Sequence, residues 1–177
     1  MYLDADDMLL PRAVETLSRV IHSNSMNVIR SSIIREENGQ NDELIAYNAS
    51  TITWFHGKIY RVSYLRENNL RFLPGLRVEE DAYFNLVAWN YTPNRGELNE
   101  ATYLWRFNNN SITRIDGPDN YFLRTYNSYI FSQVEGLKTL FSLKPDTQHA
   151  LVSTTLVNLY NYYMKARALG ADLTTTD

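Results

Sequence analysis

The chain has 177 residues, which is enough for one domain with a substantial hydrophobic core. Its formal net charge of −3 argues against a protein that binds duplex nucleic acid. It has no cysteine, which excludes disulfides, thiolate nucleophiles and cysteine-ligated zinc. No apolar run approaches the roughly 20 residues of a membrane-spanning helix, and acids stand where a signal peptide would be basic. These features predict a globular protein of the reducing cytoplasm.

The first part of the chain predicts a mixed α/β fold, because helical and strand patterns alternate. Pro11 stands where the start of a helix tolerates it, and apolar residues then recur at helical spacing. The stretch "NVIRSSIIREE" is rich in β-branched residues and ends at the turn-forming "NGQND". The expected strands are 1–3 (the end of a buried strand), 27–37, 43–48 and 97–107. The expected helices are 13–23, parts of 50–67 with an interruption near Gly57, and 79–91.

Two long helical patterns fill the rest of the chain, at 118–142 and 146–169. Pro145 separates them, and Gly170 provides a C-terminal stop. Each pattern carries an apolar face with several tyrosines, so we expect a helical hairpin. Aromatic residues make up 13% of the chain, a surplus that large cores and sugar-binding or partner-binding surfaces both use.

Asp4, Asp6 and Asp7 form an acidic cluster just before the first helix. Carboxylates this close repel one another unless a cation or N–H groups neutralise them. Alternating carboxylates offer hard oxygen ligands to Mg²⁺ or Mn²⁺, which also bind substrate phosphates. The same acids could instead cap the helix, whose N-terminus favours negative charge. The residues alone leave both interpretations open.

A second acidic group, Glu79, Glu80 and Asp81, stands at the start of the helix expected at 79–91. A carboxylate held in a cleft can act as a general base toward an attacking hydroxyl. Acids are also favourable in the first turn of any helix. Taken alone, this group favours the structural interpretation.

Two weaker groups contain side chains that could bind a ligand. "YLWRFNNNSITR" delivers Arg106 and Ser111 to a polar turn, where they could bind phosphate, although an arginine at a strand edge is usually only solvated. "WFHGKIY" contains Trp54, His56 and Lys58. The three histidines of the chain show no spacing typical of a zinc motif, and a lone histidine is more often structural than a ligand.

The order of these phrases resembles the family-two nucleotide-sugar glycosyltransferases of the GT-A fold, in particular bacterial enzymes that build surface polysaccharides. That family carries an acidic Asp-x-Asp motif after a strand, a W-x-K-like segment, a Glu-Asp pair and a Tyr/Arg strand that closes on Ser-Ile-Thr. The matching stretches are "YLDADDMLLPRAVETL", "WFHGKIYRVSYLRENNLRFLPGLRVEEDAYFN" and "YLWRFNNNSIT". The resemblance covers about residues 1–115 and implies an α/β fold: a partial, Rossmann-like GT-A sheet with flanking helices.

The resemblance implies that the acidic cluster binds the sugar-nucleotide donor. Asp4 and Asp6 match the Asp-x-Asp pair and would hold Mn²⁺ or Mg²⁺, with Asp7 as an auxiliary acid. The cation would act as a Lewis acid on the leaving diphosphate. We expect Arg106 and Ser111 to contribute to donor binding.

On the acceptor side, the resemblance implies that Asp81 of the Glu-Asp pair is the base of an inverting transfer. It would remove the proton from the attacking hydroxyl of a saccharide acceptor. Glu79 makes the register ambiguous, because an alignment on Glu79 and Glu80 would give the base position to Glu80; the spacing to "YFN" favours Asp81. Trp54 and Lys58 match the W-x-K-like segment loosely and are expected to bind the acceptor.

The resemblance also divides the chain, into an acceptor-side half at 1–115 and a C-terminal helical extension at 116–177. In the family, the half that holds the nucleotide base precedes the Asp-x-Asp motif, so we expect a C-terminal portion of a transferase. A strand stripped of its parallel neighbours exposes backbone groups, which predicts self-association or pairing with an N-terminal half. We expect both acidic groups to converge on one cleft. We also expect the protein to be cytoplasmic, or peripheral at the inner face of the membrane.

A second function class remains open at this point. The chain could be a non-catalytic interaction or oligomerisation module, derived from a truncated glycosyltransferase. Its defined oligomer would then form through the aromatic-rich C-terminal helices.

Overall fold

The computed structural model describes residues 1–23, 25–37, 41–45, 53–111, 115, 117–146 and 149–171. The chain forms two compact units. They consist of Met1–Arg71 with Phe84–Asn108, and of Phe72–Tyr83 with Asn109–Asp177. The segment Phe72–Tyr83 thus groups with the C-terminal helices, whereas the sequence suggests a single division after residue 115. The assignment of 1–115 as an acceptor-side half stays a prediction.

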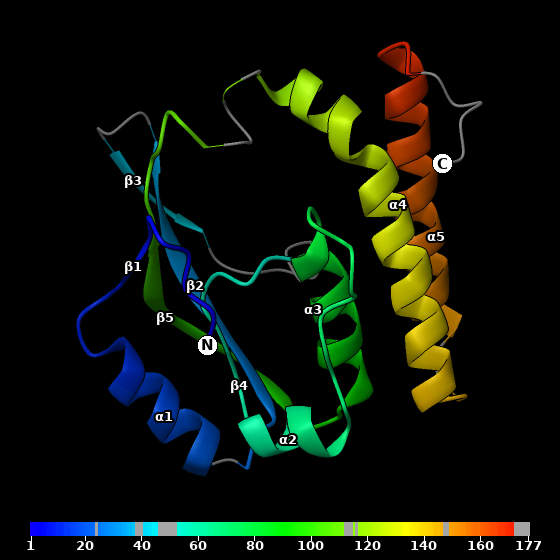
Figure 1. Ribbon diagram of the computed structural model, residues 1–177. Helices are drawn as coiled ribbons and strands as arrows, with labels where there is room; N and C mark the ends of the chain where they lie inside the picture. Colours follow the sequence, from blue (N-terminus) through cyan, green and yellow to red (C-terminus); the bar gives the residue numbers. More distant parts are fainter. Residues whose placement is uncertain are drawn as a thin grey trace. The chain divides into compact units, whose positions relative to one another are not determined.

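The first unit is built on a five-stranded mixed sheet in its described part (Figure 1). The main path runs β1–β5–β2–β3, and β4 also pairs with β2. β2 and β5 run parallel, whereas the other pairs are antiparallel. The strands are β1 (Met8–Leu9), β2 (Val28–Glu37), β3 (Asn41–Ile45), β4 (Lys58–Tyr60) and β5 (Arg95–Trp105).

β2 lies at the centre of this sheet because its β-branched residues are buried. Ile29 is 1% exposed and Ile33 is fully buried. Helix α1 (Ala13–Ser23) packs Leu17 and Ile21 against Ile29 and lies beside β2 and β5 (Figure 1). The helix predicted at 13–23 and the strand predicted at 27–37 are therefore confirmed, as is the strand that becomes β5.

Helix α3 (Glu80–Tyr91) begins in the second unit and belongs to the first from Phe84 onward. Its latter part is held by a short helix, α2 (Val62–Glu67). The phenol of Tyr64 in α2 donates a hydrogen bond to the carbonyl oxygen of Ala88 at 2.7 Å, and both residues are buried. The helix predicted at 79–91 is confirmed as α3.

The prediction of a strand at residues 1–3 is wrong. The ring of Tyr2 packs on Phe55 and Phe84, with ring centroids 4.5 and 5.7 Å apart, while Leu3 is exposed. The strand lies later in the chain, where β1 pairs with β5. Aromatic packing of one side chain, rather than a ladder of backbone hydrogen bonds, holds this segment.

The segment at 50–67 is less helical than expected. Where the structure describes it, a strand, β4, precedes the short helix α2. Gly57 adopts a φ of +64°, which lets the chain turn sharply into β4. The strand expected at 43–48 is present as β3 up to Ile45, and residues 46–52 lie outside the described residues.

Two long helices pair in the second unit, which confirms the predicted helical hairpin. They are α4 (Pro118–Leu143) and α5 (His149–Ala168). Phe122 of α4 packs on Ala166 of α5, and the rings of Tyr129 and Tyr162 stack with centroids 3.9 Å apart. Within the described ranges, no helix is both long enough and apolar enough to cross a membrane.

Replacing Gly57 with alanine should destabilise the first unit. A Cβ at this position would lie 2.8 Å from Ser31 Oγ and 2.9 Å from Ile33 Cγ2, and the left-handed backbone adds strain. The two effects together predict a loss of about 2–4 kcal/mol. Urea unfolding measures this loss.

The matched control is Gly75→Ala. Gly75 has a φ of +84° but no atom within 4 Å of the position of a Cβ, so only the backbone strain of about 1–2 kcal/mol remains. Equal losses for the two variants would contradict the packing argument at Gly57.

Candidate functional site

The acidic turn, Asp4 to Asp7, is anchored by its last residue. The backbone N–H of Asp7 donates to the carbonyl of Asp4 at 3.2 Å, which closes the turn. The buried Asp7 carboxylate accepts hydrogen bonds from the phenol of Tyr103 at 2.7 Å and from the backbone N–H of Arg106 at 2.9 Å. Burial raises the pKa of Asp7, and these two hydrogen bonds oppose that rise. Both donors lie on or just after β5, so this strand positions the turn.

Tyr103 is the second anchor of the acidic turn. Its side chain is 1% exposed, and its oxygen accepts a hydrogen bond from the backbone N–H of Asp4 at 3.3 Å while donating to Asp7. Burial and the neighbouring Asp7 carboxylate raise the pKa of Tyr103, so the phenol keeps its proton and remains a donor. Sequence reasoning did not single out Tyr103, because only its place on a strand was visible.

His56 joins the acidic turn from a distant part of the sequence. Its Nε2 lies 3.6 Å from Asp4 Oδ2 and 3.7 Å from Asp7 Oδ2. The ring is 9% exposed and stacks on Trp105 with centroids 4.7 Å apart. The hydrogen bond with His56 lowers the pKa of Asp4 and so favours its ionised form.

These three side chains make a set that could hold a metal ion. One ligand atom from each of Asp4, Asp7 and His56 lies within 4.8 Å of the others. Two carboxylates and an imidazole are ligands that suit Mn²⁺. The sequence drew attention to Asp4 and Asp7, but no local spacing signals that His56 faces them.

Asp6 is oriented differently from the other acids of the turn. It is exposed, and its Oδ2 accepts a hydrogen bond from the side-chain amide of Asn108 at 2.7 Å. Among the described residues, the acids brought together with His56 are therefore Asp4 and Asp7. The prediction that Asp4 and Asp6 bind the metal stays a prediction.

The side chains expected to bind the acceptor lie next to this cluster. The ring of Trp54 packs on Trp105 with centroids 5.3 Å apart and on His56 at 5.9 Å. Lys58 is fully buried, and its ammonium donates a hydrogen bond to the backbone carbonyl of Trp54. In this structure Lys58 ties down the loop that carries His56, and acceptor binding by either residue stays a prediction.

Arg106 and Ser111, the remaining donor-binding candidates, lie in different units. Arg106 follows β5 in the first unit, and its side chain is exposed. Its backbone N–H helps to hold the acidic turn. Ser111 belongs to the second unit, where its carbonyl accepts a hydrogen bond from the backbone of Ile115 at 3.1 Å. Their roles toward a donor stay predictions.

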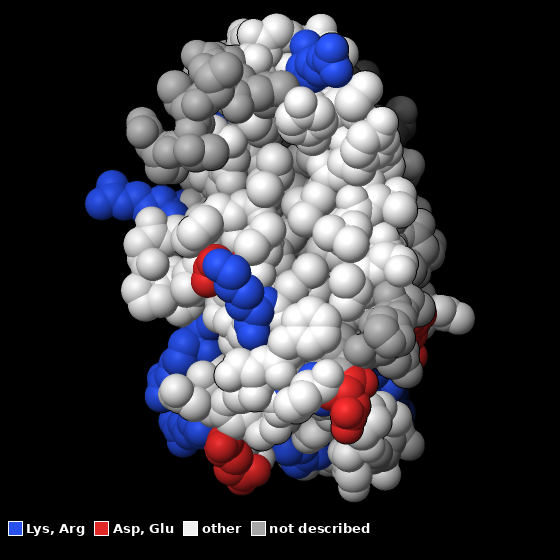
Figure 2. All heavy atoms as spheres, turned by 90° about the vertical axis from the view of Figure 1, so that its right-hand side faces the viewer, with Lys and Arg blue, Asp and Glu red and all other residues white. Residues whose placement is uncertain are grey.

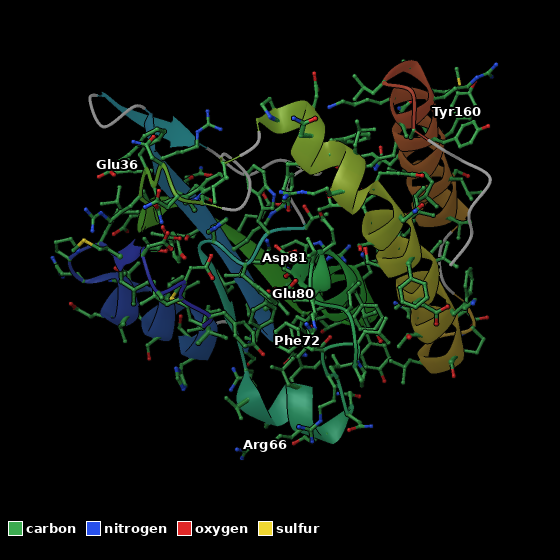
Figure 3. The ribbon with its side chains drawn as sticks, turned by 45° about the horizontal axis from the view of Figure 1, so that its top comes forward. Glu36, Arg66, Phe72, Glu80, Asp81 and Tyr160 are labelled. Carbon is green, nitrogen blue, oxygen red and sulfur yellow. The ribbon has the colours of Figure 1, made fainter. Side chains whose placement is uncertain are left out.

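Glu80 and Asp81 begin helix α3, as expected, and Figure 3 shows both at its N-terminal end. Asp81 Oδ1 accepts a hydrogen bond from the backbone N–H of Ala82 at 2.8 Å. The start of α3 lies in the second unit and the acidic turn lies in the first. Convergence of the two acidic groups on one cleft stays a prediction.

Glu79 stands out beside this pair. It adopts a φ of +63°, a region that side-chain-bearing residues rarely enter. Burial, and secondarily the charge of Glu80, raise the pKa of Glu79 to about 7. Its charge helps to raise the pKa of nearby phenols on α4 and α5, after the larger effect of burial. The sequence drew attention to Glu79 only as an ambiguity of register, since neither burial nor strain has a local signal.

Glu79 should make the stability of the second unit depend on pH. Its pKa is about 7 in the folded protein and near the ordinary value of 4.5 when unfolded, so the unfolded chain loses the proton first as pH rises. Stability is therefore full below about pH 4.5, falls as pH rises to about 7, and then levels off, with a total loss on the order of 3 kcal/mol. Glu79→Gln should remove this slope in calorimetric melting between these pH values.

The control for this measurement is Glu80→Gln, which keeps the buried Glu79 and should keep most of the slope, because burial is the larger cause of the raised pKa and the charge of Glu80 the smaller. A Glu79→Gln protein that melts with the same pH dependence as the original would show that another group causes it.

The fold of the chain is similar to that of solved structures, although no family or curated relative matches its sequence. No protein-family model matches the chain, and a search of curated proteins found no match. Similar solved structures include Staphylococcus aureus TarS 1-349 in complex with UDP-GlcNAc (TM-score 0.63) and with UDP (TM-score 0.61), each 17% identical over 99% of this chain. They also include S. aureus TarS (TM-score 0.62, 17% identical over 99% of this chain).

The chain spans 52% and 50% of those two 1-349 structures and 30% of the TarS structure, so it matches about half of the shorter form. At this level of identity the likeness concerns the fold alone. The chain has a mixed α/β fold, with a sheet and flanking helices, that is similar to the fold of these structures.

Proposed function

We propose that the chain forms the catalytic part of an inverting, nucleotide-sugar glycosyltransferase that acts on a saccharide acceptor, in bacterial surface-polysaccharide synthesis. The observation that carries the proposal is the acidic turn with His56, placed on the fold that the chain shares with TarS. TarS has been crystallised with UDP and with UDP-GlcNAc. A uridine-diphosphate sugar is accordingly the donor class that we propose.

The donor side of the reaction would use the acidic turn. Asp4 is exposed, and its lowered pKa favours the ionised form, whereas Asp7 is buried and fixed by Tyr103, so one carboxylate is accessible to solvent and the other is held rigidly. With the imidazole of His56 they offer the mixed oxygen and nitrogen ligands that fit Mn²⁺. When bound, the cation would supply Lewis-acid stabilisation of the leaving diphosphate.

The acceptor side would use the acids at the start of α3. In the proposed reaction, Asp81 takes the proton of the acceptor hydroxyl, whose oxygen forms the new bond to the anomeric carbon while the bond from that carbon to the diphosphate breaks. The backbone N–H of Ala82 orients one oxygen of Asp81. Glu80 is the alternative base, as the ambiguous register requires.

A second candidate function is a non-catalytic association module. The observation that favours it is the set of exposed apolar side chains on α4 and α5. It predicts a defined oligomer but no stabilisation by a metal and a sugar nucleotide.

Mn²⁺ together with UDP-GlcNAc should raise the melting temperature of the chain. A ligand at a hundred times its dissociation constant contributes about 2.7 kcal/mol, which corresponds to a rise of roughly 5–10 °C for a protein of this size. His56→Gln should abolish most of the rise if Asp4, Asp7 and His56 bind the metal, whereas Asp6→Asn should abolish it if the Asp4 and Asp6 pair does. Scanning calorimetry separates these cases.

The control is Glu15→Gln, which changes an exposed acid on α1 that pairs with Arg12 at the surface and should not alter the rise. Absence of any stabilisation in the unsubstituted chain would favour the association module.

Asp81→Asn should lower the release of UDP from UDP-GlcNAc by a factor of about 10²–10⁴, the usual contribution of a general base. Binding of Mn²⁺ and UDP-GlcNAc should remain, because the substitution removes only the proton acceptor. Glu80→Gln is the matched comparison. If Glu80→Gln causes the larger loss of turnover, the base assignment moves to Glu80.

A further inference from the structure

Helix α5 has an exposed apolar stripe that its pairing with α4 does not use. The stripe consists of Leu156, Val157, Tyr160, Tyr163 and Met164. Their exposed fractions range from 39% to 62%, with Tyr160 the most exposed. Their spacing of three, four, seven and eight residues places them along one side of a helix. Figure 3 shows Tyr160 projecting from α5 on the side away from α4.

The stripe is distinct from the two other sides of α5. Tyr162 and Ala166 face α4, where they pack on Phe122. Asn158 and Asn161 lie on a third, exposed and polar side. The solvent-facing half of the helix is thus itself amphipathic, which the contact with α4 alone does not require.

The surroundings of the stripe carry little charge. α5 contains no acidic residue, and its two basic side chains, Lys165 and Arg167, stand in its last turn. Figure 2 shows a broad area without charged side chains on the face turned toward the viewer, on the side of α4 and α5. A surface of this composition fits an apolar partner better than an acidic or basic one.

We propose that the α5 stripe is the contact surface of a symmetric dimer, in which α5 of a second copy packs against it antiparallel. A two-fold axis beside Tyr160 would place Leu156 of one copy opposite Met164 of the other, and Val157 opposite Tyr163. Large apolar side chains then meet large apolar side chains along the whole stripe. Such self-complementarity is what an interface between identical copies requires.

The charges of α5 favour the antiparallel over the parallel arrangement. In the antiparallel pair, Arg167 lies opposite Ser153 of the other copy, and the two basic ends are about 20 Å apart along the axis, at 1.5 Å per residue. In a parallel pair, Arg167 would face Arg167 and the helix dipoles would align unfavourably. The same charges therefore select one orientation.

The size of the stripe sets the expected strength of the dimer. Five side chains exposed to this extent present on the order of 400 Å² per copy. The area buried in the pair, on the order of 800 Å², is below the roughly 1,200 Å² of standard specific interfaces. The dimer should consequently be weak and dependent on concentration, and Tyr160 should contribute the largest share of its binding free energy.

Sedimentation velocity from about 1 to about 200 µM, a range that spans micromolar dissociation constants, tests the proposal. The chain should shift from monomer to dimer across this range. Tyr160→Glu places two carboxylates at the axis and should leave a monomer at every concentration. Val62→Glu, at a position on α2 that is 55% exposed, is the control and should dimerise like the original.

Cross-linking tests whether the stripe, rather than the polar side of α5, forms the contact. Because the chain has no cysteine, a single introduced one reports only its own position. Tyr160→Cys should give a disulfide-linked dimer on mild oxidation, whereas Asn158→Cys, on the polar side of α5, should not.

Three results would overturn the proposal. The first is a chain that stays monomeric at all concentrations, and the second is a Tyr160→Glu variant that keeps its helical circular-dichroism spectrum and still dimerises. The third is a monomeric chain that floats with anionic lipid vesicles because the stripe binds them. None of these measurements depends on the proposed enzymatic function.

Discussion

The hydrogen-bonded carboxylate of Asp7 is the constraint on which the acidic turn depends. Its two donors, Tyr103 and Arg106, lie 96 and 99 residues further along the chain, so one buried acid joins two distant segments. A buried carboxylate without donors is strongly unfavourable, so the turn can form only where β5 supplies them. The buried Asp7 thus fixes the positions of the exposed acids Asp4 and Asp6 in the same turn.

His56 gives the acidic turn a chemistry that carboxylates alone would not have. Stacking on Trp105 limits the rotation of its ring, and the buried Lys58 holds the loop that precedes β4. A ligand must be deprotonated and correctly oriented before it binds a metal, and second partners usually provide the orientation. Here aromatic packing provides it, while the lowered pKa of Asp4 keeps that acid ionised.

Sequence patterns predicted the elements whose signal is local. The helices α1, α3, α4 and α5 follow from apolar periodicity, and β2 follows from its β-branched run. The prediction of a strand at Met1–Leu3 was wrong because a run of three apolar residues has the same sequence pattern in a paired strand and in a segment that packs one ring into an aromatic cluster. The partnership of His56 with Asp4 could not be predicted, since it depends on how a sheet brings together residues about fifty positions apart. The roles of the acids themselves rest on a resemblance, because acids at a helix start look the same in a cap and in a catalytic site.

The start of α3 combines two unfavourable features in one residue. Glycine adopts a positive φ without steric strain, and Gly57, Gly75, Gly117 and Gly170 all have a positive φ. Glu79 instead carries the strain of that conformation together with the desolvation of a carboxyl group. Helix capping does not explain this choice, because acids already occupy the first turn of α3 without such strain. Strain of this kind usually persists where the side chain itself is needed. A carboxyl group that titrates near neutral pH can both donate and accept a proton, and this property distinguishes Glu79 from an ordinary surface acid.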